Sequence, residues 1–348
     1  MGRVESRSGG SHLGRRIVAI PAYLLAASLW LGAAPLWIPI AALVDAVGRR
    51  RWLALRSGLM LAVYLVCEVL GLAVSAGLWL FRAIGRIDDE RWQDVHFRLE
   101  AWWGATLFRA MVAIFGLRIE VEGDADLGRG PYLLLLRHAS TADTLLASAL
   151  ISRPHGLRLR YVLKRELLWD PCLNVVGNRI PNVFVDRSAD DSEGEVRRIA
   201  ALARGLGPRD GVLIYPEGTR FTEEKRRRVL EGFHRRGEAK LLEYSRSLSA
   251  VLPPRPGGTL GLLEEAPEAD VVIGAHSGLE GAASLASIWK GELLHRTIRV
   301  RFRRIARQHV PVAHEARVAW LREEWERLDA WIESQHSLEA AGGPEEGR

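Results

Sequence analysis

The sequence predicts an α/β fold in which a mixed sheet is flanked by helices and preceded by membrane-embedded helices. Short apolar runs bounded by turn residues alternate with helical patterns beyond residue 115, as in α/β sheets. Two long apolar runs occupy the first 81 residues and are long enough to enter a bilayer. Polar clusters directly follow two of the short runs, where ligands and chemistry collect in α/β folds.

The central strand is predicted at residues 132–136, where four leucines follow a tyrosine and the pair Gly130-Pro131. A short continuous apolar run of this kind is typical of a strand buried on both faces. Alternating arginines predict a half-exposed edge strand at 297–303. The other predicted strands are 117–122, 159–163, 183–185, 211–214 and 271–275. Helices are predicted at 142–151, at roughly 190–205, and from 312 to about 335.

Two apolar runs, 17–44 and 59–81, are predicted to be membrane-embedded. The first has no charged residue and the second has only Glu68. Pro35 and Pro39 predict that the first run breaks into a hairpin, and two glycines predict a weaker break in the second. The alternative is a pair of core helices in a soluble protein.

Arginines flank every end of these two runs, at positions 15–16, 49–51, 82 and 86. Positive charge favours the cytoplasmic side of a membrane. All flanks are therefore expected on one side. This pattern favours segments that dip into one leaflet over two ordinary spans.

A histidine and an aspartate follow the central strand. His138 comes at the strand end, and Asp143 lies five residues later in the first turn of a helix expected to begin near Ser140 or Thr141. A histidine that acts as a general base needs a carboxylate to fix its tautomer and stabilise its protonated form. The pattern predicts that catalytic pair. The alternative is a capping box, in which Asp143 serves the helix start and His138 is only a loop residue.

A second polar cluster follows the short strand at 211–214. It consists of Glu217, Gly218, Thr219 and Arg220. A carboxylate, a glycine and an arginine just past a strand end indicate an anion site that faces the first cluster.

These clusters resemble the motifs of the 1-acylglycerol-3-phosphate acyltransferases and related lysophospholipid acyltransferases. The matching segments, in order, are His138 with Asp143, Gly177 with 183–187, 217–220, and 251–254. Order and spacing agree over roughly residues 115–255. The stretch before Leu252 is similar to the lysocardiolipin acyltransferase-like branch. Arg137 stands where the family usually has an asparagine.

The resemblance implies a membrane-bound enzyme of phospholipid biosynthesis or remodelling. It implies that a fatty acyl group moves from acyl-CoA or an acyl carrier protein to the free hydroxyl of a lysophospholipid or 1-acylglycerol-3-phosphate. His138 and Asp143 are the implied catalytic residues. The implied substrate-binding residues are Lys164, Arg187, Glu217, Gly218, Thr219 and Arg220. No cofactor beyond the acyl carrier and no metal is expected. The alternatives are transacylation between two phospholipids, hydrolysis by water, and a non-catalytic membrane lipid-binding protein.

Composition places further limits on partners and location. The net charge of +6 has no nucleic-acid-binding motif with it, so membrane lipids and lipid substrates are the expected partners. Two cysteines, Cys67 and Cys172, give no disulfide framework and suit a reducing compartment. We expect the inner (cytoplasmic) membrane, with the catalytic domain facing the cytoplasm. The expected layout is a disordered tail over 1–14, membrane-embedded helices over 15–86, an acyltransferase catalytic domain over 87–336, and a disordered tail over 337–348.

Overall fold

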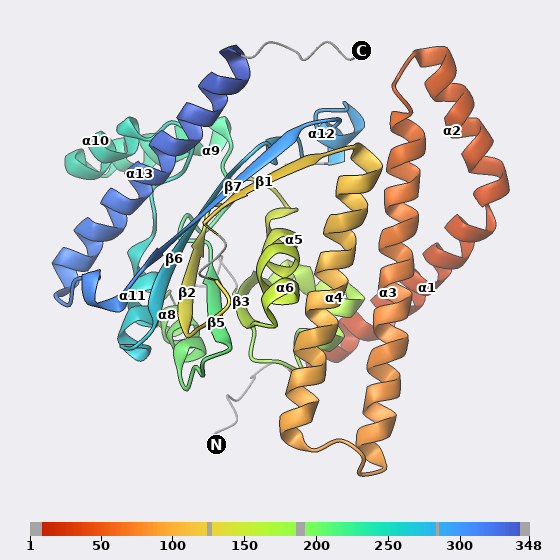
Figure 1. Ribbon diagram of the computed structural model, residues 1–348, viewed down its shortest axis with the longest axis horizontal. Coiled ribbons are helices and arrows are strands. Elements are labelled where there is room, and N and C mark those ends of the chain that lie inside the picture. Colours follow the sequence, from red (N-terminus) through yellow and green to blue (C-terminus); the bar gives the residue numbers. More distant parts are fainter. Residues whose placement is uncertain (1–8, 124–126, 186–191, 283–284, 342–348) are drawn as a thin grey trace.

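A seven-stranded mixed sheet forms the centre of the protein (Figure 1). The computed structural model describes residues 9–123, 127–185, 192–282 and 285–341. The strand order is β1-β7-β6-β2-β5-β3-β4, and every neighbouring pair is parallel except β6 and β7. The strands are β1 Arg118–Glu122, β2 Tyr132–Leu136, β3 Arg158–Lys164, β4 Val183–Val185, β5 Asp210–Ile214, β6 Asp270–Ser277 and β7 Thr297–Ile305. The predicted mixed α/β sheet is confirmed.

The edge position predicted for residues 297–303 is wrong. β7 lies between β1 and β6, and β1 forms the edge of the sheet. Two arginines of β7 pair with carboxylates on β1: Arg299 Nε lies 2.9 Å from Glu120 and Arg301 Nε lies 2.6 Å from Glu122. The alternation of apolar residues and arginines shows only that one face of the strand is exposed to solvent. A strand inside the sheet can also have one exposed face.

Helices cover both faces of the sheet. The long helices are α1 Gly9–Gly32, α2 Ala34–Gly48, α3 Leu53–Ala83, α4 Asp89–Phe115 and α13 His314–Ala341. The shorter ones are α5 Asp143–Ala147, α6 Arg153–His155, α7 Pro171–Val176, α8 Ser192–Ala200, α9 Glu223–Arg235, α10 Ala239–Ser247, α11 Pro256–Glu265 and α12 Leu285–Trp289. Leu134 and Leu136 of β2 pack in a core with α4 and α5, whereas Leu133 and Leu135 pack in a core with α11 and α13. β2 is therefore buried on both faces, as its sequence predicts.

Three helix boundaries differ from those predicted. The helix after β2 begins at Asp143, not at Ser140 or Thr141. α1 begins at Gly9, so residues 9–14 are helical where a disordered tail is predicted. α13 extends to Ala341, so residues 337–341 are helical as well. The outer parts of both predicted tails lie outside the described residues.

The N-terminal apolar runs form α1, α2 and α3. By length and composition, Leu13–Gly32 and Leu53–Ala83 can cross a membrane, and Ala34–Gly48 is a shorter apolar helix. The first run breaks at Ala33, but α2 continues away from α1 without folding back (Figure 1). The predicted hairpin is wrong because Pro35 lies in the first turn of α2, where proline is tolerated. The break predicted in the second run is also wrong, since α3 is continuous.

Candidate functional site

His138 and Asp143 form a hydrogen-bonded pair just past the end of β2. The distance from His138 Nδ1 to Asp143 Oδ2 is 3.0 Å, and the imidazole stacks on Tyr215 with ring centroids 4.3 Å apart. Asp143 is fully buried, while the His138 side chain keeps 15% of its surface exposed. With Nδ1–H donating to the carboxylate, the tautomer places the basic lone pair on Nε2. This is the arrangement that a general base requires.

The Asp143 carboxylate is held by several donors. Its Oδ2 accepts from the backbone N–H groups of Ala139 at 2.7 Å and Ser140 at 2.8 Å, and its Oδ1 accepts from Ser140 Oγ at 2.8 Å. Burial alone would raise the pKa of Asp143, but the imidazoles of His276 and His138 and their hydrogen bonds hold it well below its usual range. The carboxylate is therefore ionised at neutral pH.

The capping-box alternative is borne out in part, because Asp143 Oδ2 accepts from the Ser140 N–H at 2.8 Å, but His138 is more than a loop residue because it bonds to the same carboxylate. Ser140 Oγ donates to Asp143 and accepts from the Ala142 N–H at 3.0 Å, and the residue that caps the helix is Ala142, whose side chain makes no capping bond. The donors to Asp143 hold residues 139–142 in a non-helical turn, so α5 begins later than the sequence predicts.

His276 supports the same carboxylate from β6. Its Nε2 lies 3.4 Å from Asp143 Oδ1 and 3.2 Å from the Arg137 carbonyl oxygen, and the side chain is fully buried. Within the described residues its Nδ1 has no hydrogen-bond partner. Sequence analysis assigned no role to His276. The available signal is a histidine within an apolar strand, which is ambiguous without the strand order.

Glu217 connects the two polar clusters. Its Oε1 accepts from the His138 N–H at 2.8 Å, and its Oε2 accepts from the Leu252 N–H at 2.9 Å. Burial raises the pKa of Glu217 to about 8, although the two N–H donors and Arg137 oppose that shift. The side chain is turned into the protein and is 2% exposed. In this structure Glu217 is placed to position the backbone of His138 and not to contact a substrate.

We expect Glu217→Gln to destabilise the protein by about 1–3 kcal/mol, because an amide N–H₂ must then face one of two buried backbone N–H donors. The midpoint of thermal unfolding should fall, and kcat should fall in the folded fraction because His138 loses its backbone anchor. Glu231→Gln is the matched control, since Glu231 is exposed on α9. A parent-like unfolding midpoint for Glu217→Gln would contradict the positioning role.

The remaining residues of the second cluster form a turn beside His138. Gly218 has φ of +71°, which favours glycine, and a Cβ there would lie 3.2 Å from Arg255 Cδ. Lys225 Nζ donates to Thr219 Oγ1 at 2.9 Å and to the Arg220 carbonyl oxygen at 3.0 Å. The N–H of the residue after Arg220 donates to the His138 carbonyl oxygen at 2.7 Å. Arg220 is therefore next to the catalytic pair along the backbone, and Arg255 is a second arginine at the turn.

An apolar cavity begins at the catalytic loop. Its volume is about 670 Å³, and it lies between α3, α4, α5 and β3. Thr141 and Ala142, which lie between His138 and Asp143 in the chain, form part of its wall. Aliphatic and aromatic side chains supply most of the rest, among them Met60, Leu61, Trp103, Leu107, Met111 and Leu145. The cavity suits a hydrocarbon chain whose reactive end lies at His138.

Comparison with known proteins agrees with this geometry. Residues 118–244 match the family model described as Acyltransferase. This segment holds both polar clusters, so the part of the chain that resembles acyltransferases is the part that carries the site. Over 121 residues, the chain is 31% identical to mouse (Mus musculus) 1-acyl-sn-glycerol-3-phosphate acyltransferase epsilon. That alignment covers 33% of this chain and 33% of the mouse protein, so the chain matches about a third of that relative's length.

A solved structure supports the fold of the acyltransferase domain and its preceding helices. The crystal structure of the 1-acyl-sn-glycerophosphate (LPA) acyltransferase PlsC from Thermotoga maritima superposes with a TM-score of 0.51. The superposition covers 81% of this chain and 98% of that protein, at 14% sequence identity. The resemblance inferred from the motifs is confirmed.

One predicted substrate-binding residue, Lys164, is not brought to the catalytic pair. Lys164 ends β3, two strands from β2, and its Nζ lies 3.1 Å from Glu166 with half of the side chain exposed. Because side chains alternate along a strand, Lys164 points to the opposite face from Leu163, which lines the cavity. Arg187 lies outside the described residues.

Arg137, where the acyltransferase family usually has an asparagine, is buried beside the site. It pairs with Glu280, and its guanidinium also donates to the carbonyl oxygens of His276 and Ala250, at 3.0 Å for Ala250. Burial would raise the pKa of Glu280, but Arg137 and His336 hold it well below its usual range. The arginine is thus accommodated by an acid and carbonyls from later in the chain.

The described residues contain no candidate metal site. No group of three or more His, Cys, Asp or Glu side chains there could hold a metal ion. Chemistry without a metal stays a prediction.

Proposed function

We propose that this chain is a glycerolipid acyltransferase of the lysophosphatidate acyltransferase type. It transfers a fatty acyl group from an acyl thioester to the free hydroxyl of a 1-acylglycerol-3-phosphate or another lysophospholipid. The observation that carries the proposal is the His138–Asp143 pair in a loop whose Thr141 and Ala142 line an apolar cavity of about 670 Å³.

The geometry supports direct transfer. The acceptor hydroxyl donates to His138 Nε2, which takes its proton as the oxygen attacks the thioester carbonyl carbon. The carbon–sulfur bond then breaks, and the protonated imidazole returns the proton to the departing thiolate. Asp143 stays ionised throughout and stabilises the imidazolium. An ester and a free thiol result, with no acyl–enzyme intermediate.

We assign each substrate to a separate region. The acyl chain of the donor occupies the apolar cavity. The acceptor phosphate binds at the 217–220 turn, where Arg220 offers the planar fork that suits a phosphate. Gly218 and Thr219 shape that turn, and its backbone amides contribute to anion binding.

A thioester-consumption assay on the purified chain, with and without a panel of lysolipids, tests the proposal. We expect free thiol to appear only when a lysolipid is present, together with the diacyl product. Thiol release without acceptor would instead identify a hydrolase. Acyl exchange between phospholipid and lysophospholipid without thioester would identify a transacylase, and no turnover in any combination would favour a non-catalytic lipid-binding protein.

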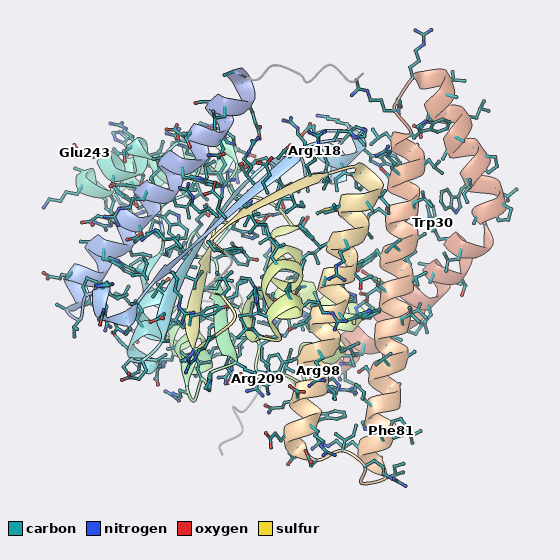
Figure 2. All side chains as sticks on the ribbon, in the orientation of Figure 1. Trp30, Phe81, Arg98, Arg118, Arg209 and Glu243 are labelled. Atoms are coloured by element: carbon teal, nitrogen blue, oxygen red, sulfur yellow. The ribbon has the colours of Figure 1, made fainter. Side chains whose placement is uncertain are left out.

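We also propose that α1–α3 lie in one leaflet of the cytoplasmic membrane, with the catalytic domain in the cytoplasm. Contacts at both ends of α3 tie it to α4: Arg56 donates to the Ile114 carbonyl oxygen at 2.7 Å, and Arg82 lies 2.6 Å from Asp89. Since α4 carries core residues of the sheet domain, α3 runs beside the domain along its length. Figure 2 shows Phe81 and Trp30 on these outer helices, away from the sheet.

The start of α1 also contacts the domain. Arg16 donates to Asn174 Oδ1 and to its carbonyl oxygen, both at 2.8 Å, and Arg15 donates to the Arg165 carbonyl oxygen at 3.3 Å. A helix fixed to the domain at its first turns begins on the same side of the membrane as the domain.

We therefore expect single cysteines at Leu13, Arg51 and Arg86, all exposed positions, to be labelled from the cytoplasmic side. The background carries Cys67→Ala and Cys172→Ala, which removes the native thiols. The measurement is labelling by a membrane-impermeant thiol reagent in sealed vesicles of each orientation. Exclusive labelling of the Arg51 position from the far side would show that the runs are ordinary spans.

A further inference from the structure

Glu100 is an acidic side chain in the wall of the apolar cavity. It lies on α4, is 9% exposed and lines the cavity. Asn182 Nδ2 donates to its Oε1 at 3.0 Å, and within the described residues this is the hydrogen bond that the carboxyl makes. As a lining residue, Glu100 places a polar side chain in a wall that is otherwise mostly apolar.

The Glu100 carboxyl is neutral at pH 7, because burial raises its pKa to about 8. A neutral carboxyl offers both an O–H donor and acceptor oxygens. A buried polar group without a full set of partners costs stability, and a polar group on a bound ligand would supply the missing partner.

Two hydroxyl groups lie beside Glu100 in the same wall. Ser148 Oγ and Tyr161 OH are 3.2 Å apart, and both residues line the cavity. Gly104, one turn after Glu100 on α4, lies against Ser148, since a Cβ there would be 2.5 Å from Ser148 Oγ. We call Glu100, Ser148 and Tyr161 the polar band.

The polar band lies part of the way along the cavity from the catalytic pair. Ser148 is five residues after Asp143 along a helical backbone, which corresponds to about 7.5 Å at 1.5 Å per residue. An acyl chain whose carbonyl carbon lies at His138 therefore passes the band between its two ends.

We propose that the polar band binds a hydroxyl group carried by the acyl chain, so that the preferred donor is a hydroxylated fatty acyl thioester. The inference rests on the proposed function and specifies its donor. A hydroxyl can donate to and accept from the band, whereas an unsubstituted chain leaves a buried carboxyl facing methylene groups. A site built to hydrogen-bond a substrate hydroxyl discriminates against the analogue that lacks it.

The test compares coenzyme A thioesters of one chain length: unsubstituted, and hydroxylated near the carbonyl, near the middle, or near the methyl end. We expect kcat/KM for one of the inner hydroxyacyl donors to exceed that of the unsubstituted donor by about tenfold, the size of one buried hydrogen bond. Glu100→Leu should abolish the preference. Glu100→Gln should keep part of it, because the amide can still accept from Asn182 and donate into the cavity.

Glu90→Leu is the matched control, since it makes the same substitution at an exposed position in the first turn of α4 and should leave the preference unchanged. If Glu100 were purely structural and acted through Asn182, Glu100→Leu would have a lower unfolding midpoint and an equally reduced kcat/KM for all donors. That result, or equal kcat/KM for all donors in the parent, would overturn the inference while leaving the acyltransferase proposal standing.

Binding of free fatty acids separates this inference from the proposed function. Hydroxylated and unsubstituted acids compete with a fluorescent fatty acid for the parent protein, without any turnover. Tighter binding of a hydroxylated acid, lost in Glu100→Leu, is expected even if no donor reacts. Equal affinities would show that the polar band does not bind the ligand's hydroxyl group. Glu100 would then be assigned a hydrogen bond to a bound water molecule.

Discussion

His138→Ala is expected to lower kcat by at least about a hundredfold, the lower range for loss of a general base. The reason is geometric: His138 is the imidazole whose Nδ1 is fixed 3.0 Å from a buried, ionised carboxylate. Asp143→Asn should also lower kcat, because an amide cannot stabilise the imidazolium that forms during transfer. The measurement is single-turnover acyl transfer with saturating donor and acceptor.

The two variants need different controls. His138→Ala removes a side chain that is 15% exposed and takes one hydrogen-bond partner from Asp143, so its unfolding midpoint should fall less than that of Asp143→Asn. Asp143→Asn leaves two backbone N–H groups facing an amide, so a lower midpoint is expected there and activity must be compared in the folded fraction. Folded His138→Ala protein with near-parent turnover would remove the proposed mechanism.

The strands of the fold are predictable because each is a local pattern. Residues 132–136 and 211–214 are continuous apolar runs between turn residues, and both are strands buried on both faces. The order of the strands is not local. β1 and β7 are adjacent although about 180 residues separate them, so nothing near residues 297–303 indicates that a partner covers that edge.

The catalytic pair is predictable for the same reason. His138 and Asp143 lie within one strand-to-helix turn, so their spacing alone brings them together. His276 comes from β6 and Glu280 from the turn after it, and only the pairing of β6 with β2 brings them to the site. The position of Glu217 can be found from the sequence, but its role cannot. Nothing in the sequence indicates that the side chain turns inward to bind two backbone N–H groups.

Arg220→Ala is expected to raise the KM for a phosphate-bearing acceptor by roughly tenfold to a hundredfold, the range for loss of charge-assisted hydrogen bonds. The phosphate carries the same charge before and during acyl transfer, so the interaction is similar in the ground and transition states and kcat should change less. The KM for the thioester should stay nearly unchanged. Arg220→Lys should recover only part of the loss, because an ammonium cannot reproduce the planar fork.

Lys164→Ala is the matched comparison for Arg220→Ala. Arg220 is one residue from the backbone bond to His138, whereas Lys164 lies at the end of β3 with its ammonium 3.1 Å from Glu166. β5 lies between β3 and β2, so the two strands are two spacings apart, about 10 Å, and Lys164 must leave Glu166 to reach a phosphate near His138. We expect a smaller rise in acceptor KM for Lys164→Ala. The measurement is steady-state kinetics with each substrate varied, on variants whose unfolding midpoints match that of the parent. A selective rise in the thioester KM for Arg220→Ala would show that Arg220 binds the donor.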